Sequence, residues 1–541
     1  MPPRPSLVLV ACLAAGPAGA DEAVRSGGTR VSGTLTFADG RFAFHAPDGT
    51  NPADLDLVRF AIKPPVPPPV ALWHQVRLGP GEVLLAEVRS LDATHLHVRP
   101  AWGGALAVPR TAVERVTNAP GWRPVFFDTF DGDLARWTKS GEPRAASGQL
   151  VFDRAGQAIE GKWKDSSPAG RVAVGFRSAV TTSRRLSLEL GFVRDGKPAP
   201  VRVELVGPGP RYVVTSPAKA SHEGALKRDA GSHRLAAEFD RDRLHLFLDD
   251  LVLRTQDTGP GELQSIRLVA DGDGAEPAAV DNVLVARPEP AREPRSWADL
   301  TADAVRSPDG DETFGTILGA GPSGVAFEVK GRKLSLGWPE VAEFAFRRGP
   351  VAERATEGEH VRVRVRSADG ARDVLVGAVT AFDHKRLVLA HAVLGDLTIP
   401  RDRVEEIRFL FRGRRVPVDA SPHHLGTRPA FGFAVPKPDG LRFAKAVTVD
   451  PVPAGGFVVV EAARVSGSGP SVEVLLNGER LGELNRSADR PDHVVRAYRF
   501  PVPASVWRKD NEVEVRLRPP EDGKRIPGVD LRALRLEVNS K

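Results

Sequence analysis

Cysteine is almost absent from this chain. The only one among the 541 residues is Cys12, so disulfide bonds, thiolate metal sites and cysteine nucleophiles are excluded from everything after the first twenty residues. Long apolar runs are also lacking. No segment after those residues approaches the roughly 18 consecutive apolar residues that cross a bilayer. We therefore expect no transmembrane span after the N-terminal segment.

The first twenty residues have the pattern of a signal peptide. Arg4 supplies a positive start, an apolar run follows, and Ala18-Gly19-Ala20 offers the small residues that a signal peptidase needs. This predicts a secreted or periplasmic protein. Leu9-Val-Ala-Cys12 also resembles a lipoprotein processing box, so a second interpretation is a lipid anchor on Cys12.

The chain also lacks a strong excess of positive or negative charge. The net charge is +6, from 75 basic and 69 acidic side chains, and this small, dispersed excess is not that of a nucleic-acid binder. Glycine and proline are abundant instead, with 53 and 47 residues, and 41% of the residues are hydrophobic. A chain of this kind folds, and it makes many turns between short elements.

The hydrophobic pattern repeats every two residues and predicts an all-β, multi-domain fold of β-sandwiches and small barrel-like units. The segment 234–253 reads as a hairpin, and Asn477-Gly478 is a strong hairpin turn signal. The one helix candidate is 296–305, with Ser296 as its N-cap. Gly319 to Gly324 matches Gly-x-Gly-x-x-Gly, but the strand-like residues after it favour a hairpin loop.

Internal duplication is the strongest signal in the chain. Residues 83–116 align without a gap on 374–407 at an offset of 291, with 12 of 34 positions identical, including Pro109/Pro400 and Arg110/Arg401. Each copy follows a looser unit of about 40 residues, which is marginal alone. We expect each looser unit to share a core with the copy that follows it.

Proline-rich and polar linkers separate these regions. The expected division is a signal peptide at 1–20, a small β unit at 21–70, barrel-like repeat A at 71–120, a β-sandwich at 121–290, a small β unit at 291–350, barrel-like repeat B at 351–415 and a jelly roll at 416–541. The third linker, 419–429, contains His423 and His424.

Residues 124–287 resemble the concanavalin A-like lectin/glucanase sandwich. The matching residues are Phe127 to Leu134 with Trp137, Gly148 to Leu150, Asp240 to Arg243, Leu248 to Asp250, and Val280 to Val285. The resemblance implies two stacked antiparallel sheets and a concave face where relatives bind or cleave glycans. Residues 430–540 are similar to a galactose-binding-like jelly roll, and the repeated units to Sm- or SH3-like barrels.

Candidate ligand-binding residues are few. Trp163 and Tyr212 lie in polar stretches of the sandwich region, where an exposed ring stacks on a sugar, so both are predicted carbohydrate contacts. The glucanase pattern Glu-x-Asp-x-x-Glu has its nearest match at 238–243, where Arg243 replaces the last carboxylate. Asp128, Asp131 and Asp133 read as a polar turn rather than a calcium site, and His95 with His97 as a solvated strand face. We therefore expect no catalytic residue, no metal and no cofactor.

These observations predict an exported, non-enzymatic protein that binds envelope or environmental polysaccharide. A second interpretation is a structural role in which the duplicated units bind an envelope protein. A third is a glycoside hydrolase-like enzyme acting on a disaccharide or glucan, and it requires carboxylates that are scattered in sequence to gather at one place in the fold. No nucleic acid partner is expected.

Overall fold

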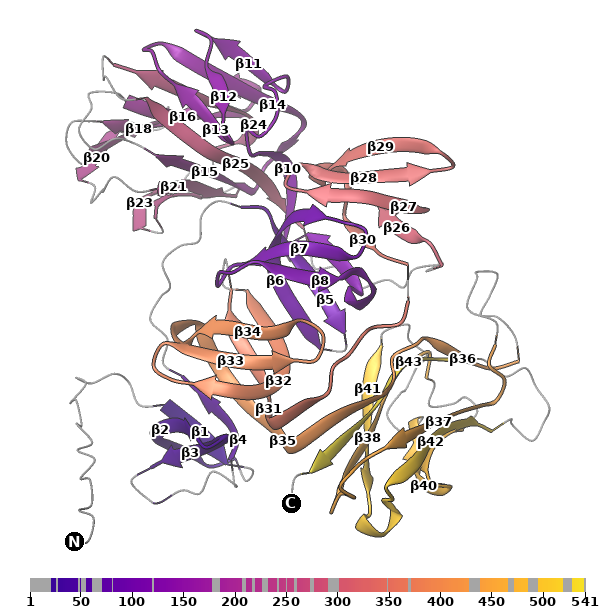
Figure 1. Cartoon of the computed structure of the whole chain (residues 1–541). Coiled ribbons are helices and arrows are strands. Elements are labelled where there is room, and N and C mark those ends of the chain that lie inside the picture. The colour runs from indigo at the N-terminus through magenta and orange to yellow at the C-terminus, as the bar shows by residue number, and fades with distance from the viewer. Residues whose placement is uncertain are drawn as a thin grey trace, which may run out of the picture.

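The computed structural model is built almost entirely of antiparallel strands (Figure 1). The structure describes residues 21–25, 28–46, 49, 55–60, 71–79, 81–118, 121–177, 185–206, 211–216, 219–225, 232–240, 243–249, 251–256, 260–272, 277–289, 301–347, 349–367, 371–427, 438–465, 471–484, 495–518 and 528–539. The all-β, multi-domain prediction is confirmed. The predicted signal peptide and Cys12 lie outside the described residues, and within the described part no helix is long and apolar enough to cross a membrane.

The duplicated segments fold alike. The first repeat comprises β5 (Trp73–Gly79), β6 (Glu82–Leu91), β7 (His95–Pro100), β8 (Leu106–Pro109), the 3₁₀ turn η2 (Arg110–Ala112) and β9 (Arg115–Asn118). The second comprises β31 (Thr356–Arg366), β32 (Arg372–Phe382), β33 (Arg386–His391), β34 (Gly395–Pro400), η5 (Arg401–Arg403) and β35 (Val404–Asp419). The two 3₁₀ turns are related by the offset of 291, so the duplication seen in sequence is also a duplication of structure.

The looser units also correspond to each other. The first small unit holds β1 (Asp21–Arg25), β2 (Arg30–Ala38), β3 (Arg41–His45) and β4 (Leu55–Arg59). The second small unit holds β26 (Asp303–Arg306), β27 (Glu312–Gly321), β28 (Gly324–Val329), β29 (Arg332–Gly337), η3 (Trp338–Glu340) and β30 (Glu343–Ala345). The Gly319 to Gly324 motif is the β27–β28 hairpin turn, as its context predicted.

Each small unit docks on the repeat that is distant in sequence. In the first small unit, β4 pairs with β35 of the second repeat, where Val58 lies opposite Ile407. In the second small unit, β30 pairs with β9 of the first repeat, where Phe344 lies opposite Val116. Strand pairing therefore joins each small unit to the repeat that is distant in sequence rather than to the one that follows it, while all four units contribute to one hydrophobic cluster. Strand pairing depends on backbone edges that meet in space, and nearness in sequence does not decide it.

Equivalent arginines of the two repeats, Arg401 and Arg110, make the two crosswise contacts. Arg401 pairs with Asp21 at 3.4 Å and lies over the Phe60 ring at 3.7 Å. Its counterpart Arg110 pairs with Asp303 at 2.7 Å and lies over the Phe346 ring at 4.5 Å. Each aspartate also accepts a backbone N–H from its own small unit. The identical residue pair found by the sequence repeat thus anchors two equivalent interfaces.

The middle of the chain forms a β-sandwich, seen at the top of Figure 1. Its inner sheet holds β10 (Trp122–Asp128), β12 (Arg144–Ala146), β13 (Gln149–Phe152), β15 (Gly170–Arg177), β21 (Ser232–Phe239), β22 (Leu244–Leu248), β23 (Leu251–Gln256) and β25 (Ala278–Pro288). Its outer sheet holds β11 (Trp137–Ser140), β14 (Gln157–Ser167), β16 (Arg185–Arg194), β17 (Lys197–Pro198), β18 (Val201–Val206), β19 (Arg211–Ser216), β20 (Lys219–Ala225) and β24 (Glu262–Asp271). The predicted hairpin at 234–253 is the β21–β22 pair, extended by β23.

The C-terminal part is a second stack of two sheets. One sheet holds β37 (Arg442–Thr448), β39 (Val472–Leu476), β40 (Glu479–Glu483) and β42 (Asp510–Leu517). The other joins β36 (His423–Leu425), β38 (Gly456–Ala463), β41 (Arg496–Val502) and β43 (Val529–Asn539) to the end of β35. A 3₁₀ turn, η7 (Ala504–Val506), precedes β42. Asn477 and Gly478 both have positive φ, 53° and 82°, as the predicted hairpin turn requires.

Two local predictions were wrong. Of the expected helix at 296–305, residues 296–300 lie outside the described part, while β26 is a buried strand between β27 and β30. Burial on both sides in a sheet outweighs weak helical propensity in a short segment. The segment expected as a third linker contains β36, in which His424 is fully buried and bonds to Asp530 at 2.7 Å.

Candidate functional site in the sandwich

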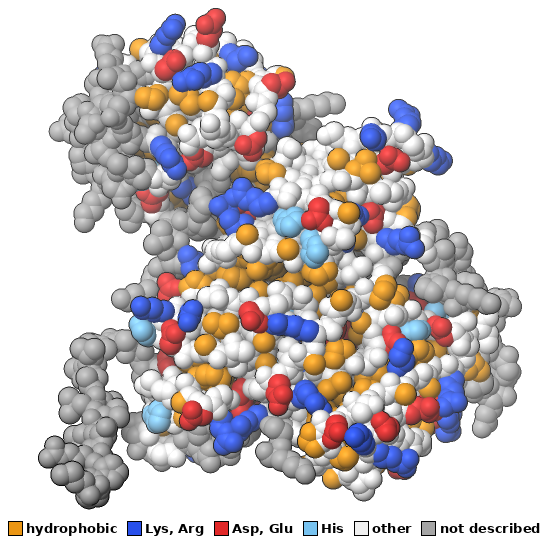
Figure 2. Space-filling view, in the orientation of Figure 1, with side chains coloured by type: hydrophobic (Ala, Val, Ile, Leu, Met, Phe, Trp, Pro, Cys, Tyr) orange, Lys and Arg blue, Asp and Glu red, His pale blue; other side chains and the backbone are white. Residues whose placement is uncertain are grey.

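The two sheets of the sandwich differ in what covers their outward faces. On the inner sheet, the outward residues Phe127, Ala173, Ala236 and Leu284 are buried in the hydrophobic cluster that also fills the repeats. The inner sheet therefore packs against the rest of the molecule. The outer sheet turns a polar face outward, and Figure 2 shows acidic and basic side chains interspersed over the sandwich.

A row of polar side chains crosses this polar face. Ile159, Leu188 and Leu268 point into the sandwich core. Because successive residues of a strand point to opposite sides of the sheet, the residues next to them in sequence point outward. The strand register then aligns one outward residue from each of six strands side by side. In order across the sheet, the row is Thr138, Glu160, Arg267, Glu189, Arg202 and Thr215.

Acidic and basic residues alternate in this row, and its carboxylates are not equally paired. Glu160 forms an ion pair with Lys162 at 3.2 Å. Arg202 pairs with Glu204 at 2.9 Å and bonds to the Ser187 hydroxyl at 3.2 Å. Glu189 lies between two arginines and, among the described residues, makes no hydrogen bond or ion pair. Glu189 is thus the carboxylate of the row most available to a ligand.

Glu160 on β14 and Glu189 on β16 are the strand partners of Arg267 on the central strand β24, one on each side. Two strand spacings of about 4.8 Å place their backbones about 10 Å apart. Glycosidases that invert configuration hold their two carboxyl groups about 6.5–9.5 Å apart, with room for a water molecule between them. The strand register therefore places two carboxylates from separate strands on the two sides of Arg267.

The two aromatic residues predicted to contact carbohydrate lie away from this row. Tyr212 is 7% exposed in the sandwich core, and its hydroxyl donates to the Leu253 carbonyl at 2.9 Å. Trp163 is half-buried at the core margin, 6.1 Å from the Phe126 ring centre. Both belong to the inward side of their strands. Sugar contact by either residue stays a prediction. The sequence did not reveal the polar row of the outer sheet, because no local motif joins its six residues.

The other candidates make local hydrogen bonds. Asp128 accepts the Phe130 N–H and the Trp137 indole N–H. Asp240 accepts the Arg243 N–H in the β21–β22 turn.

His97 bonds to Asp92 at 2.6 Å, and this bond, together with the N–H groups of the turn, holds the pKa of Asp92 well below its usual range. His95 bonds to the Thr94 hydroxyl at 2.8 Å. Within the part of the chain that the structure describes, no three histidine or carboxylate residues cluster as a metal site.

No family model and no curated protein sequence matches this chain. Among solved structures, the catalytic domain of an endo-1,3-β-glucanase (laminarinase) from Thermotoga petrophila RKU-1 is 11% identical, with 32% of this chain and 100% of that chain covered and a TM-score of 0.27. The endo-β-1,3-glucanase from Pyrococcus furiosus is 13% identical, with 32% and 97% covered and a TM-score of 0.27. The CBM2 module of a Lactobacillus casei BL23 phage J-1 Dit protein is 11% identical, with 32% and 99% covered and a TM-score of 0.27.

The glucanases among these structures have the concanavalin A-like fold that the sequence resembles. Their presence contradicts our expectation that the chain is not an enzyme, and that expectation is withdrawn. The resemblances of the C-terminal part to galactose-binding-like jelly rolls and of the repeats to Sm- or SH3-like barrels stay predictions.

Proposed function

We propose that this protein is a glycoside hydrolase-like enzyme that binds a glucan on the outer sheet of its sandwich. The observation that carries the proposal is the position of Glu160 and Glu189, one on each side of Arg267. A polar row of carboxylate, guanidinium and hydroxyl groups can hydrogen-bond sugar hydroxyls on both sides of a glycosidic bond. Two carboxylates at this spacing can serve as the acid and base of hydrolysis with inversion.

The proposal is tested by incubating the full chain with 1,3-β-glucan and measuring released reducing ends. We expect Glu160→Gln and Glu189→Gln each to lower the rate at least 100-fold, because each removes one of the two proton-transfer groups. Glu238→Gln is the matched control, since Glu238 is an exposed carboxylate on the inner sheet.

Two outcomes would contradict the proposal. One is the absence of any release from 1,3-β-glucan or mixed-linkage glucan together with no binding to them. The other is an equal loss of activity in the Glu238→Gln control, which would place the chemistry elsewhere. NMR of the first product adds a second check, because the carboxylate spacing predicts inversion at the anomeric carbon.

A further inference from the structure

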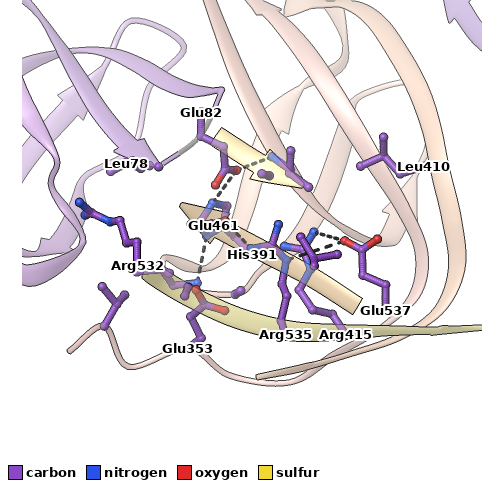
Figure 3. Close-up of a pocket in the computed structure, with 18 of the residues that line it drawn as sticks. Leu78, Glu82, Glu353, His391, Leu410, Arg415, Glu461, Arg532, Arg535 and Glu537 are labelled. Atoms are coloured by element: carbon purple, nitrogen blue, oxygen red, sulfur yellow. Dashed lines mark hydrogen bonds and ion pairs between the residues drawn. The ribbon is translucent and has the colours of Figure 1, made fainter. Parts of the chain in front are cut away.

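A cavity of about 230 Å³ lies where the two repeats meet the C-terminal part (Figure 3). Leu78 and Glu82 come from the first repeat, and Arg532 and Arg535 from β43. Glu353 lies just before β31 of the second repeat, and His391 lies at the end of β33. The volume is smaller than a drug-sized pocket and suits a ligand of monosaccharide size. None of these residues belongs to the sandwich, so the cavity is separate from the site described above.

Most charges around the cavity are matched within the protein. Glu82 accepts the Val376 N–H at 2.7 Å and pairs with His391 at 3.1 Å. Burial raises the pKa of Glu82, but its bonds and the positive charge nearby bring that pKa below its usual value. Glu461 pairs with Arg535. These groups therefore form the fixed wall of the cavity.

Glu537 completes this wall. It pairs with Arg499 at 2.7 Å and with Arg415 at 3.4 Å. Both guanidinium groups are thus already bound to a carboxylate of the protein, and neither is available as the main anchor of a ligand.

Three charged lining groups remain without a partner in the described part of the chain: Arg362, which is exposed, and the more buried Arg532 and Glu353. Arg532 makes no hydrogen bond or ion pair there, although its Nη1 atom is buried. Glu353 likewise makes none, and burial raises the pKa of its carboxyl. A buried donor without an acceptor loses its hydrogen bonds to water without compensation, which destabilises the folded state. The unpartnered Arg532 donor lies at a cavity, where a bound ligand can supply the missing acceptor.

The charge balance restricts the ligand. Five arginines and four glutamates line the cavity, an excess of one positive charge. A guanidinium binds a carboxylate through two parallel hydrogen bonds. A monoanion therefore matches the cavity better than a phosphate dianion, and Leu78, Val376 and Val459 supply apolar walls for a small carbon skeleton.

We propose that this cavity binds a small hydroxylated monocarboxylate of the uronic acid class, with Arg532 holding the carboxylate and Glu353 bonding to a hydroxyl. The ligand is either a free acid or the end of an acidic polysaccharide. In both cases the carboxylate and its neighbouring hydroxyls are what the cavity recognises. This inference does not depend on the glucan site of the sandwich.

Isothermal titration calorimetry of the full chain with sodium glucuronate, glucose and inorganic phosphate tests the proposal. We expect glucuronate to bind at least tenfold more tightly than glucose or phosphate. Arg532→Met should weaken glucuronate binding at least tenfold, and Arg532→Lys at least threefold because lysine keeps the charge but loses the paired donors. Arg442→Met is the matched control, since Arg442 pairs with Glu512 and Glu514 outside the cavity, and it should change binding less than twofold.

A second readout concerns pH. The groups facing Glu353 are Arg535, Arg415, Glu461 and Glu82. Because an ionised Glu353 repels a carboxylate, glucuronate affinity should fall as pH rises through the raised pKa of Glu353, and Glu353→Gln should remove this dependence. Absence of glucuronate binding, equal binding of glucose or phosphate, or unchanged binding in both Arg532 variants would overturn the proposal. Tighter binding of a glucuronate-ended oligosaccharide than of free glucuronate would support it and identify a chain end as the source.

Discussion

Replacing Arg401 with alanine should loosen two segments that are more than 300 residues apart in sequence. Arg401 links η5 of the second repeat to Asp21 and Phe60 of the first small unit. The substitution leaves the Asp21 carboxylate, which is 15% exposed, without its cation. Removing one partner of a buried ion pair costs about 3–5 kcal/mol, and the cation–π contact adds about 1 kcal/mol. The 3.4 Å separation is long, so we expect a loss of about 2–3 kcal/mol.

Arg110→Ala is the matched variant in the other interface. Its partner Asp303 is only 7% exposed, and the contact is shorter at 2.7 Å. The loss should therefore be larger, about 3–4 kcal/mol. It should fall on the first repeat and the second small unit, leaving the interface around Arg401 intact.

Hydrogen–deuterium exchange measured peptide by peptide separates the two effects, because local opening is reported segment by segment. In Arg401→Ala, exchange should rise in 21–60 and in 356–407, with 303–346 unchanged. In Arg110→Ala, it should rise in 303–346 and 73–118, with 21–60 unchanged. Faster exchange of 303–346 in Arg401→Ala, with 21–60 unaffected, would refute the crosswise docking, since that result is expected if each small unit packs on the repeat that follows it.

Two further predictions concern a buried carboxyl group and a half-buried turn residue. Burial raises the pKa of Asp373 from 3.8 to about 7, so between pH 4 and 7 the folded chain retains a proton that the unfolded chain releases. Stability should therefore fall as pH rises through this window, by up to roughly 4 kcal/mol, and urea unfolding of Asp373→Asn should lack this fall. Asn477→Ala removes side-chain bonds to Val506 and Glu512 and puts alanine at φ 53°. It should lower the free energy of unfolding, measured by urea denaturation, by about 2–3 kcal/mol. Asn477→Gly should lower it less, because glycine accepts this φ; equal losses in the two variants would show that the positive φ contributes nothing.

The sequence alone determined the local structure and the duplication. Alternating residues predicted strands because one face of each strand must be buried. Asn477-Gly478 predicted its hairpin because both residues tolerate positive φ, and the offset of 291 predicted a duplicated unit, in which the structure places matching 3₁₀ turns at Arg110 and Arg401. These features depend on neighbours within about ten residues. The helix expected at 296–305 failed because its strand partners, β27 and β30, are set by the sheet rather than by local propensity.

Only the tertiary structure decided which strands lie side by side. The period of two assigns each residue to a face, but it does not say which strand is adjacent. Val58 could therefore not be matched to Ile407 from sequence, nor Glu160 and Glu189 to the two sides of Arg267. The cavity beside Arg532 depends on three parts of the chain meeting. Crosswise docking and both candidate sites arise from long-range pairing, because backbone hydrogen bonds between strands are the same whatever the sequence distance between them.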